Sequence, residues 1–124
     1  MVGIGRTPPP VGPERGDIYF IDFAEIGGRV IRGPHPAVVV QTGRLRRSGT
    51  TIIAAMTSSP RSAEFDPPYL VAATARETGL DRDGWVKCDQ LATYPAESLG
   101  PRAGRLAPEA ITRLDAALRF VLGL

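Results

Sequence analysis

The amino-acid sequence predicts a small, mainly β domain that ends in one α-helix. Short apolar stretches rich in β-branched residues recur along the chain, and turns rich in glycine and proline separate them. That spacing is typical of a small barrel or sandwich. Only the last stretch, residues 108–122, repeats its apolar side chains at helical spacing. With 124 residues, the chain is long enough for one domain whose core needs no disulfide.

Three strands are expected in the first half of the chain. The first, residues 16–23, carries apolar side chains on both faces. A loop that carries arginines and glycines follows over residues 24–34, and a β-branched run forms the second strand, residues 36–42. A basic turn at residues 43–49 leads into the third strand, residues 50–57.

Two further strands are expected before the helix. A polar loop over residues 58–66 precedes residues 67–72, which should lie at a sheet edge because their leading prolines cannot donate to a ladder. A turn at residues 77–84 then leads to a strand over residues 85–91, which residues 92–95 extend after a bend. The predicted order is therefore a series of strands followed by a helix.

The C-terminal helix carries its own start and stop signals. Pro108 suits the first helical position, and Glu109 suits the first turn, where the helix dipole favours an acidic side chain. Gly123 is placed to end the helix. An apolar stripe on one side should pack on the sheet; it consists of Ile111, Leu114, Leu118 and Val121 or Leu122.

Composition limits the kinds of site that the chain can build. Cys88 is the only cysteine and His35 the only histidine. An internal disulfide is thereby excluded and a zinc site is disfavoured, so we expect no metal and no cofactor. The net charge is +2, and all basic residues except Lys87 and His35 are arginines. Arginine suits phosphate binding, but a GC-rich genome produces the same bias, so composition alone does not identify a nucleic-acid partner.

The N-terminal segment, residues 1–14, is rich in proline and glycine and offers little to bury. We expect it to be a flexible arm before a domain over residues 15–124. The proline run at residues 8–10 could be a polyproline ligand or simply part of an unstructured tail. The N-terminus lacks the hydrophobic region of a secretory signal, and no apolar run is long enough to span a bilayer, so we expect a cytoplasmic protein.

The most informative stretch covers residues 29–42. Its first half is basic and rich in proline, which predicts a loop, and its second half contains the β-branched run. His35 lies at the junction, between Pro34 and Pro36, which restrict its backbone to extended geometry. A stiffly held, titratable side chain at the mouth of a buried strand marks a candidate site.

Four stretches, in order and at matching spacing, resemble the MazF/PemK family of toxin ribonucleases from toxin–antitoxin pairs. The resemblance covers about residues 14–124, nearly the whole chain. The stretches are residues 15–19 (Arg-Gly-Asp-Ile-Tyr), residues 35–40 (His-Pro-Ala-Val-Val-Val, where the family usually begins with arginine), residues 50–58 ending in Thr-Ser, and residues 86–91 (Val-Lys-Cys-Asp-Gln-Leu) followed by residues 104–109 (Gly-Arg-Leu-Ala-Pro-Glu).

This resemblance implies a fold, an activity and partners. The fold would be a small SH3-like barrel with a C-terminal helix, shared by MazF, PemK and CcdB-like toxins, and the protein would form a homodimer. The activity would be growth-inhibiting cleavage of single-stranded RNA, chiefly messenger RNA, at short sequences without a metal or cofactor. A cognate antitoxin with a disordered tail would cover the site.

Metal-independent cleavage lets the ribose 2′-OH attack the adjacent phosphorus. The reaction needs a base, an acid and donors for the charge on the phosphate. The family's pattern places an arginine before the proline of the second strand and a threonine at the end of the third. By this resemblance Thr57 occupies the threonine position, with Ser58 beside it; otherwise both are ordinary strand-end residues that bond their own backbone.

The arginine position holds His35 instead. An imidazole transfers protons near neutral pH better than a guanidinium does, but it cannot bind a phosphate bidentately. Arg32 or Arg29 could supply that charge. Alternatively, His35 plays no direct part and the activity is altered or lost. The candidate catalytic residues are therefore His35, Thr57 and Arg32.

Other residues are candidates for contact with RNA. The turn at residues 43–49 holds the densest basic patch, which would either follow RNA phosphates or be a solvated turn. The polar pair at residues 89–90 would read base edges of a single strand or bond neighbouring loops. The predicted RNA-binding residues are Arg29, Ser58, Arg44, Arg46, Arg47, Asp89 and Gln90.

Two other functions are compatible with the same fold. A CcdB-like toxin would bind DNA gyrase without cleaving nucleic acid, through residues of the C-terminal helix. A degenerate relative would bind RNA or antitoxin but have no activity. The motifs above favour the ribonuclease.

Overall fold

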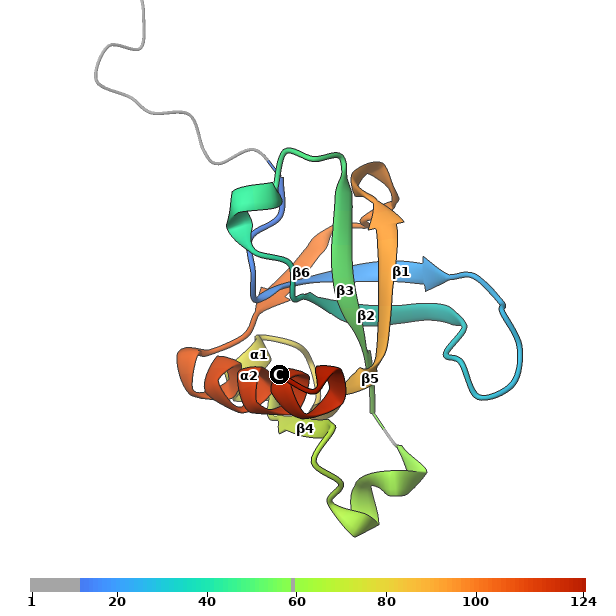
Figure 1. Ribbon diagram of the computed structural model, residues 1–124, viewed down its shortest axis with the longest axis vertical. Helices are drawn as coiled ribbons and strands as arrows, with labels where there is room; N and C mark the ends of the chain where they lie inside the picture. Colours follow the sequence, from blue (N-terminus) through green and yellow to red (C-terminus); the bar gives the residue numbers. More distant parts are fainter. Residues whose placement is uncertain (1–11, 59) are drawn as a thin grey trace, which may run out of the picture.

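The computed structural model describes residues 12–58 and 60–124. In this part of the chain six strands form one curled sheet, in which every neighbouring pair is antiparallel and the order is β4-β5-β3-β2-β1-β6 (Figure 1). The strands are β1 (Asp17–Phe23), β2 (Gly33–Val39), β3 (Thr50–Thr57), β4 (Leu70–Ala73), β5 (Gly84–Pro95) and β6 (Arg102–Arg105).

Buried side chains lie on both faces of the sheet because successive strand residues point to opposite sides. On β1, Ile18 belongs to the cluster that the C-terminal helix completes, whereas Ile21 and Phe23 belong to a second cluster on the other face. On β2 and β3, Val38 joins the first cluster and Ile53 the second. The prediction that the first strand carries apolar side chains on both faces is confirmed, although Phe20 and Asp22, on the same face as Ile18, are exposed.

The C-terminal helix α2 (Pro108–Leu122) covers the first cluster. Its Leu114 and Leu118 are buried, as the predicted stripe requires. Pro108 stands in the first turn, and Gly123, with φ of 71°, ends the helix. The mainly β fold with a C-terminal helix is therefore confirmed. None of the helices in the described residues is long and apolar enough to cross a membrane.

Pro13 and Glu14 contact the domain, although we expected the domain to start at residue 15. Pro13 is buried, and the backbone N–H of Glu14 donates to Asp17 Oδ2 at 2.9 Å. The remainder of the predicted arm, residues 1–11, includes the triple proline and lies outside the described residues.

The second strand begins earlier than predicted. We expected a loop up to residue 34, but β2 starts at Gly33 and pairs with β1, with His35 opposite Ile21. Proline is tolerated here because the extended backbone that it favours suits a strand, and its missing N–H falls on an unpaired edge. His35 is thus a strand residue and not a loop residue.

Two strand predictions are confirmed and one strand was missed. The third strand covers Thr50–Thr57, as expected. The predicted edge strand is β4, which lies at one edge of the sheet and begins after both prolines, at Leu70. The missed strand, β6, is short and polar, so neither alternation nor apolar content marked it. It pairs with β1 and forms the other edge.

A short helix precedes the predicted turn at residues 77–84. This helix, α1 (Ala75–Thr78), has a capping box in which Thr74 Oγ1 accepts from the Glu77 N–H at 3.2 Å and Glu77 Oε1 accepts from the Thr74 N–H at 3.0 Å. One helical turn shows no periodicity, so its only sequence signal was the Thr-x-x-Glu motif. The predicted polar loop likewise contains a 3₁₀ turn over Arg61–Phe65.

The fifth strand, β5, contains the bend that the sequence predicted. The bend lies slightly before residue 92, where we expected it. Lys87 pairs with Ala55 of β3, but Ala54 pairs with Leu91, so residues 88–90 bulge out of this ladder. A bulge increases the local twist and redirects side chains. It turns the polar pair at residues 89–90 towards the loop between β1 and β2, as the contacts below show.

Candidate active site

The site lies where β2 and β3 separate. Their ladder ends at the pair Ala37–Ala55. Val40 donates its N–H to Ile52 of β3, so alternation places the ring nitrogens of Pro36 and Pro34 on the same edge of β2, where they have no hydrogen to donate. The two strands therefore part beyond Ala37. Continuing the register puts His35 opposite Thr57, with no ladder between them.

Two cavities meet at this opening, and His35 and Thr57 line both of them. The first cavity has a volume of about 710 Å³ and the second about 610 Å³. The first is lined further by Phe20, Pro34, Pro36, Met56, Ser58, residues 79–84 and residues 101–103. The second is lined further by Arg29, Ile31, Pro60, Arg61, Tyr69, Lys87, Asp89 and Gln90.

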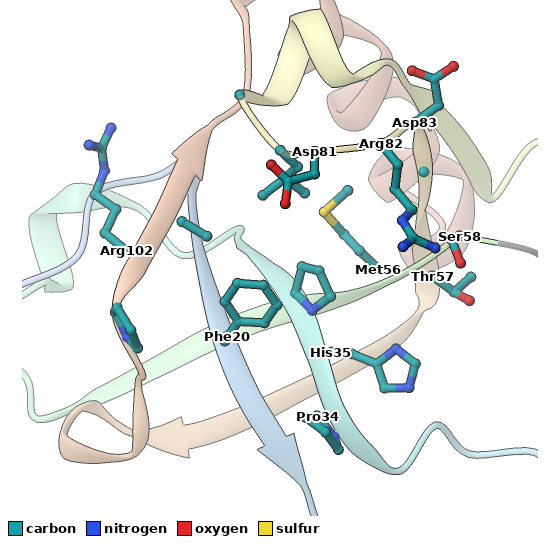
Figure 2. Close-up of a pocket in the computed structure, with 16 residues that line it drawn as sticks. Phe20, Pro34, His35, Met56, Thr57, Ser58, Asp81, Arg82, Asp83 and Arg102 are labelled. Carbon is teal, nitrogen blue, oxygen red and sulfur yellow. The ribbon is translucent and has the colours of Figure 1, made fainter.

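The loop between α1 and β5 forms part of the wall of the first cavity. Figure 2 shows Arg82 of that loop extending over the cavity, with its guanidinium pointing towards the end of β3, where Thr57 and Ser58 lie. The imidazole of His35 projects from β2 on the lower side of the same view. A guanidinium, two hydroxyls and an imidazole therefore border one space.

His35 is held by aromatic neighbours. Its ring meets Phe23 edge-to-face, with ring centroids 6.4 Å apart, and Phe23 meets Tyr94 in the same manner at 5.6 Å. The hydroxyl of Tyr94 in turn accepts the backbone N–H of Ala24 at 3.0 Å. Edge-to-face packing restricts ring rotation, so the imidazole has a defined direction at the cavity.

The hydroxyls at the end of β3 are free to accept a ligand. Thr57 is half-buried and Ser58 is exposed, and within the described residues neither side chain forms a hydrogen bond. The alternative that these hydroxyls bond their own backbone is therefore not what the described residues show.

The second cavity combines positive charge with an aromatic ring. Arg29, Arg61 and Lys87 contribute the charge, and Tyr69 contributes a half-buried ring. This mixture suits a nucleotide, because cations bind its phosphate and the ring stacks on its base. Asp89 is exposed at the same cavity and offers an acceptor for the edge of a base.

The side-chain amide of Gln90 forms two hydrogen bonds with the protein backbone. Its Oε1 accepts the Ile31 N–H at 2.9 Å, and its Nε2 donates to the Arg29 carbonyl at 3.0 Å. These bonds fasten the loop between β1 and β2 to the β5 bulge. Of the two roles considered for Gln90, the contacts show the bond to a neighbouring loop.

Four of the predicted residues lie away from both cavities. Arg32 forms an exposed ion pair with Glu25 at 3.2 Å and lines neither cavity. The basic turn precedes Thr50, at the far end of β3 from Thr57, which is about 23 Å away at 3.3 Å per residue. Figure 1 shows this turn and the loop that follows β3 at opposite ends of the molecule. The turn holds Arg44, Arg46 and Arg47.

Sequence reasoning missed Arg82 and Arg61. Arg82 lies between two aspartates in a stretch that resembles an ordinary charged turn. The available signal was its position just before β5, because β5 pairs with β3 and brings Gly84 against the Thr57 carbonyl, 3.2 Å from an added Cβ. That pairing joins distant parts of the chain, so it was not visible locally.

Cys88 takes no part in the site chemistry. It is fully buried, and burial, with a smaller contribution from Asp89, raises the pKa of its thiol to about 12. A thiol with that pKa stays protonated at neutral pH and is a poor nucleophile. Among residues 12–58 and 60–124, no three His, Cys, Asp or Glu side chains come together as a metal site would require.

Known proteins match this chain over almost all its length. The family described as PemK-like, MazF-like toxin of type II toxin-antitoxin system matches residues 14–122. The chain is 31% identical over 112 residues to Endoribonuclease EndoA from Bacillus subtilis (strain 168), a match covering 90% of this chain and 95% of that protein.

Solved structures share the fold. An endoribonuclease from a mycobacterial species, solved in complex with its cognate antitoxin, has a TM-score of 0.72 at 24% identity, covering 91% of this chain and 97% of the other. MazF from Deinococcus radiodurans has a TM-score of 0.75 at 19% identity, covering 91% and 98%. The sequence matches go further than the fold, and they show that the chain belongs to the PemK-like, MazF-like family of type II toxin–antitoxin toxins.

Proposed function

We propose that this toxin endoribonuclease cleaves single-stranded RNA, chiefly messenger RNA, without a metal, at a phosphate held between His35 and Thr57. The observation that supports it most is the parting of β2 and β3 beyond Ala37, at a place where His35 and Thr57 line both cavities. A strand of RNA can then lie across the opening, with one nucleotide in each cavity and the phosphate between them.

In the proposed mechanism the ribose 2′-OH attacks the adjacent phosphorus. The oxygen–phosphorus bond to the 5′-oxygen of the next nucleotide breaks, which leaves a 2′,3′-cyclic phosphate and a 5′-OH. His35 takes the proton from the 2′-OH, and the imidazolium can return a proton to the leaving oxygen. The hydroxyls of Thr57 and Ser58 donate to the non-bridging oxygens, where charge develops.

The second cavity provides the proposed sequence preference. Arg29, Arg61 and Lys87 bind a neighbouring phosphate there, the base stacks on Tyr69, and Asp89 accepts from its edge. Gln90 contributes by holding the adjacent loop, and its remaining amide hydrogen can also reach RNA.

The remaining basic residues are assigned to the flanks of the RNA. Arg32 binds a flanking phosphate only after exchanging its contact with Glu25, which costs little because that pair is exposed. Arg44, Arg46 and Arg47 reach only an RNA that extends to the far end of β3. We also propose a homodimer and a cognate antitoxin with a disordered tail; one solved relative is in complex with its cognate antitoxin.

The test is incubation of the purified protein with mixed-sequence RNA in excess chelator. We expect the wild type to leave 5′-OH ends at a short preferred sequence. His35→Ala and Thr57→Ala should each lower the rate by about 100-fold. Thr112→Ala, on the exposed side of α2, should cleave like the wild type.

The RNA assay, together with measurements of gyrase activity and growth, distinguishes the alternatives. A CcdB-like toxin would leave the RNA whole yet inhibit gyrase, and an inactive relative would leave it whole and not slow growth. Cleavage that survives intact in both His35→Ala and Thr57→Ala would contradict the assigned site.

A further inference from the structure

The loop between α1 and β5, residues 79–84, is fixed at both ends. At its start, the Leu80 N–H donates to Thr78 Oγ1 at 3.0 Å, and Thr78 is buried. At its end, Asp83 Oδ1 accepts the Ala75 N–H at 2.7 Å, and the buried Gly84 begins β5. Arg82 lies between these anchors, so its backbone position is set by the fold.

The helix before this loop is itself tied to the body of the protein. Arg113 of α2 donates to both carboxylate oxygens of Glu77, at 2.9 and 2.8 Å. The hydrogen bond from Arg113 lowers the pKa of Glu77 below its ordinary value, so this ion pair persists to lower pH than an unpaired glutamate would allow. The support under Arg82 therefore extends to the C-terminal helix.

Arg82 is the uncommitted guanidinium of the first cavity. Arg102 lines the same cavity but binds Asp17 through Nε at 3.3 Å. Within residues 12–58 and 60–124, Arg82 forms no ion pair, although aspartates flank it. The Asp83 carboxylate is used at the start of α1, and Figure 2 shows the Asp81 carboxylate away from Thr57. A phosphate at the end of β3 would therefore be a suitable partner for Arg82.

We propose that Arg82 is a catalytic residue that binds the phosphate being cleaved and replaces the guanidinium missing at position 35. The two tasks of the site are then divided: His35 moves protons, and Arg82 with Thr57 stabilises the charge on the non-bridging oxygens. Guanidinium is suited to the second task because it stays charged and binds two oxygens at once. This inference rests on the proposed cleavage of RNA.

The experiment compares five variants, including Arg29→Ala, on one short RNA in excess chelator. Arg82→Ala should lower the cleavage rate by about 100-fold, and Arg82→Lys by less, because lysine keeps the charge but not the fork. His35→Ala tests the division of tasks: binding of a 2′-deoxy analogue of the same RNA, which cannot be cleaved, should be weakened in Arg82→Ala but nearly unchanged in His35→Ala, because only Arg82 is assigned to the phosphate charge. Arg76→Ala, on α1 and outside both cavities, is the matched control and should cleave like the wild type.

Each other outcome overturns the inference in a distinguishable way. If the wild type cleaves but Arg82→Ala cleaves equally well, only the role of Arg82 is wrong. If Arg29→Ala is inactive while Arg82→Ala is not, the charge comes from the second cavity. If His35→Ala weakens binding of the 2′-deoxy analogue as much as Arg82→Ala does, the two tasks are not divided between these residues. If the wild type leaves RNA whole, the proposed function and this inference fail together.

Discussion

At the scale of single residues, two threonines on one strand serve opposite purposes. Thr57, at the end of β3, is half-buried beside the cavities, and its hydroxyl is available to a ligand. Thr51, near the start of β3, is fully buried, and its Oγ1 has no hydrogen-bond partner among the described residues. A buried hydroxyl loses its hydrogen bonds to water, and without a protein partner this unfavourable free energy is not compensated.

We therefore predict that Thr51→Val stabilises the protein by about 1 kcal/mol, because valine has the same shape without the unsatisfied hydroxyl. Urea unfolding followed by fluorescence measures the change in free energy of unfolding. The same substitution at Thr57 is the matched comparison: it should leave the stability nearly unchanged and lower RNA cleavage by about 100-fold. A less stable Thr51→Val protein would show that the hydroxyl is satisfied after all.

At the scale of elements, the site depends on how closely α1 and β6 approach. Gly104 of β6 lies against the end of α1, where an added Cβ would collide with the carbonyl oxygen of Thr78. That carbonyl immediately precedes the loop over residues 79–84, which carries Arg82. A change on an edge strand can therefore reach the site through the backbone.

Gly104→Ala should lower the free energy of unfolding by about 1–3 kcal/mol, because backbone must move to make room. It should also lower cleavage by about tenfold in the fraction that remains folded, since the loop moves with α1. Gly43→Ala is the control, because its Cβ would meet only Arg46 Nη1 at 3.7 Å, an ordinary contact. Thermal unfolding and a cleavage assay on the same samples check both effects; unchanged cleavage would mean that the loop is held independently of β6.

At the scale of the whole molecule, the basic residues divide between the two ends of β3. Arg29, Arg61 and Arg82 adjoin the cavities at one end. Arg44 and Arg47 are exposed in the turn at the other. Arg46 has a structural task in that turn, where its Nη1 donates to the Gly43 carbonyl at 2.9 Å. The length of the RNA should therefore determine which arginines contribute to binding.

We predict that replacing Arg44 and Arg47 together by alanine changes the cleavage rate of a short RNA by less than about twofold. Binding to a long RNA should become less dependent on salt, with a slope that corresponds to the loss of up to about two phosphate contacts. Cleavage rates on the short RNA and binding of the long one over a range of salt concentrations measure both. Equal losses on short and long RNA would contradict the separation of the two ends.

The sequence by itself determined most of the element types and identified His35 and Thr57 as candidates for the site. Alternating and β-branched stretches gave the strands, helical spacing gave α2, and the motifs marked His35 and Thr57. These signals are local, because each depends on neighbours within a few residues. The short polar β6 and the single turn of α1 were not predicted, because elements of that length contain too few positions to show a period.

Only the tertiary structure decided which side chains share the site. The opening between His35 and Thr57 depends on where the β2–β3 ladder ends, and the position of Arg82 depends on the pairing of β5 with β3. The same pairings leave Arg32 and the basic turn outside both cavities. Strand order and register join residues far apart in the chain, and the free energy that selects them comes from packing the whole sheet, so no local stretch of sequence contains them.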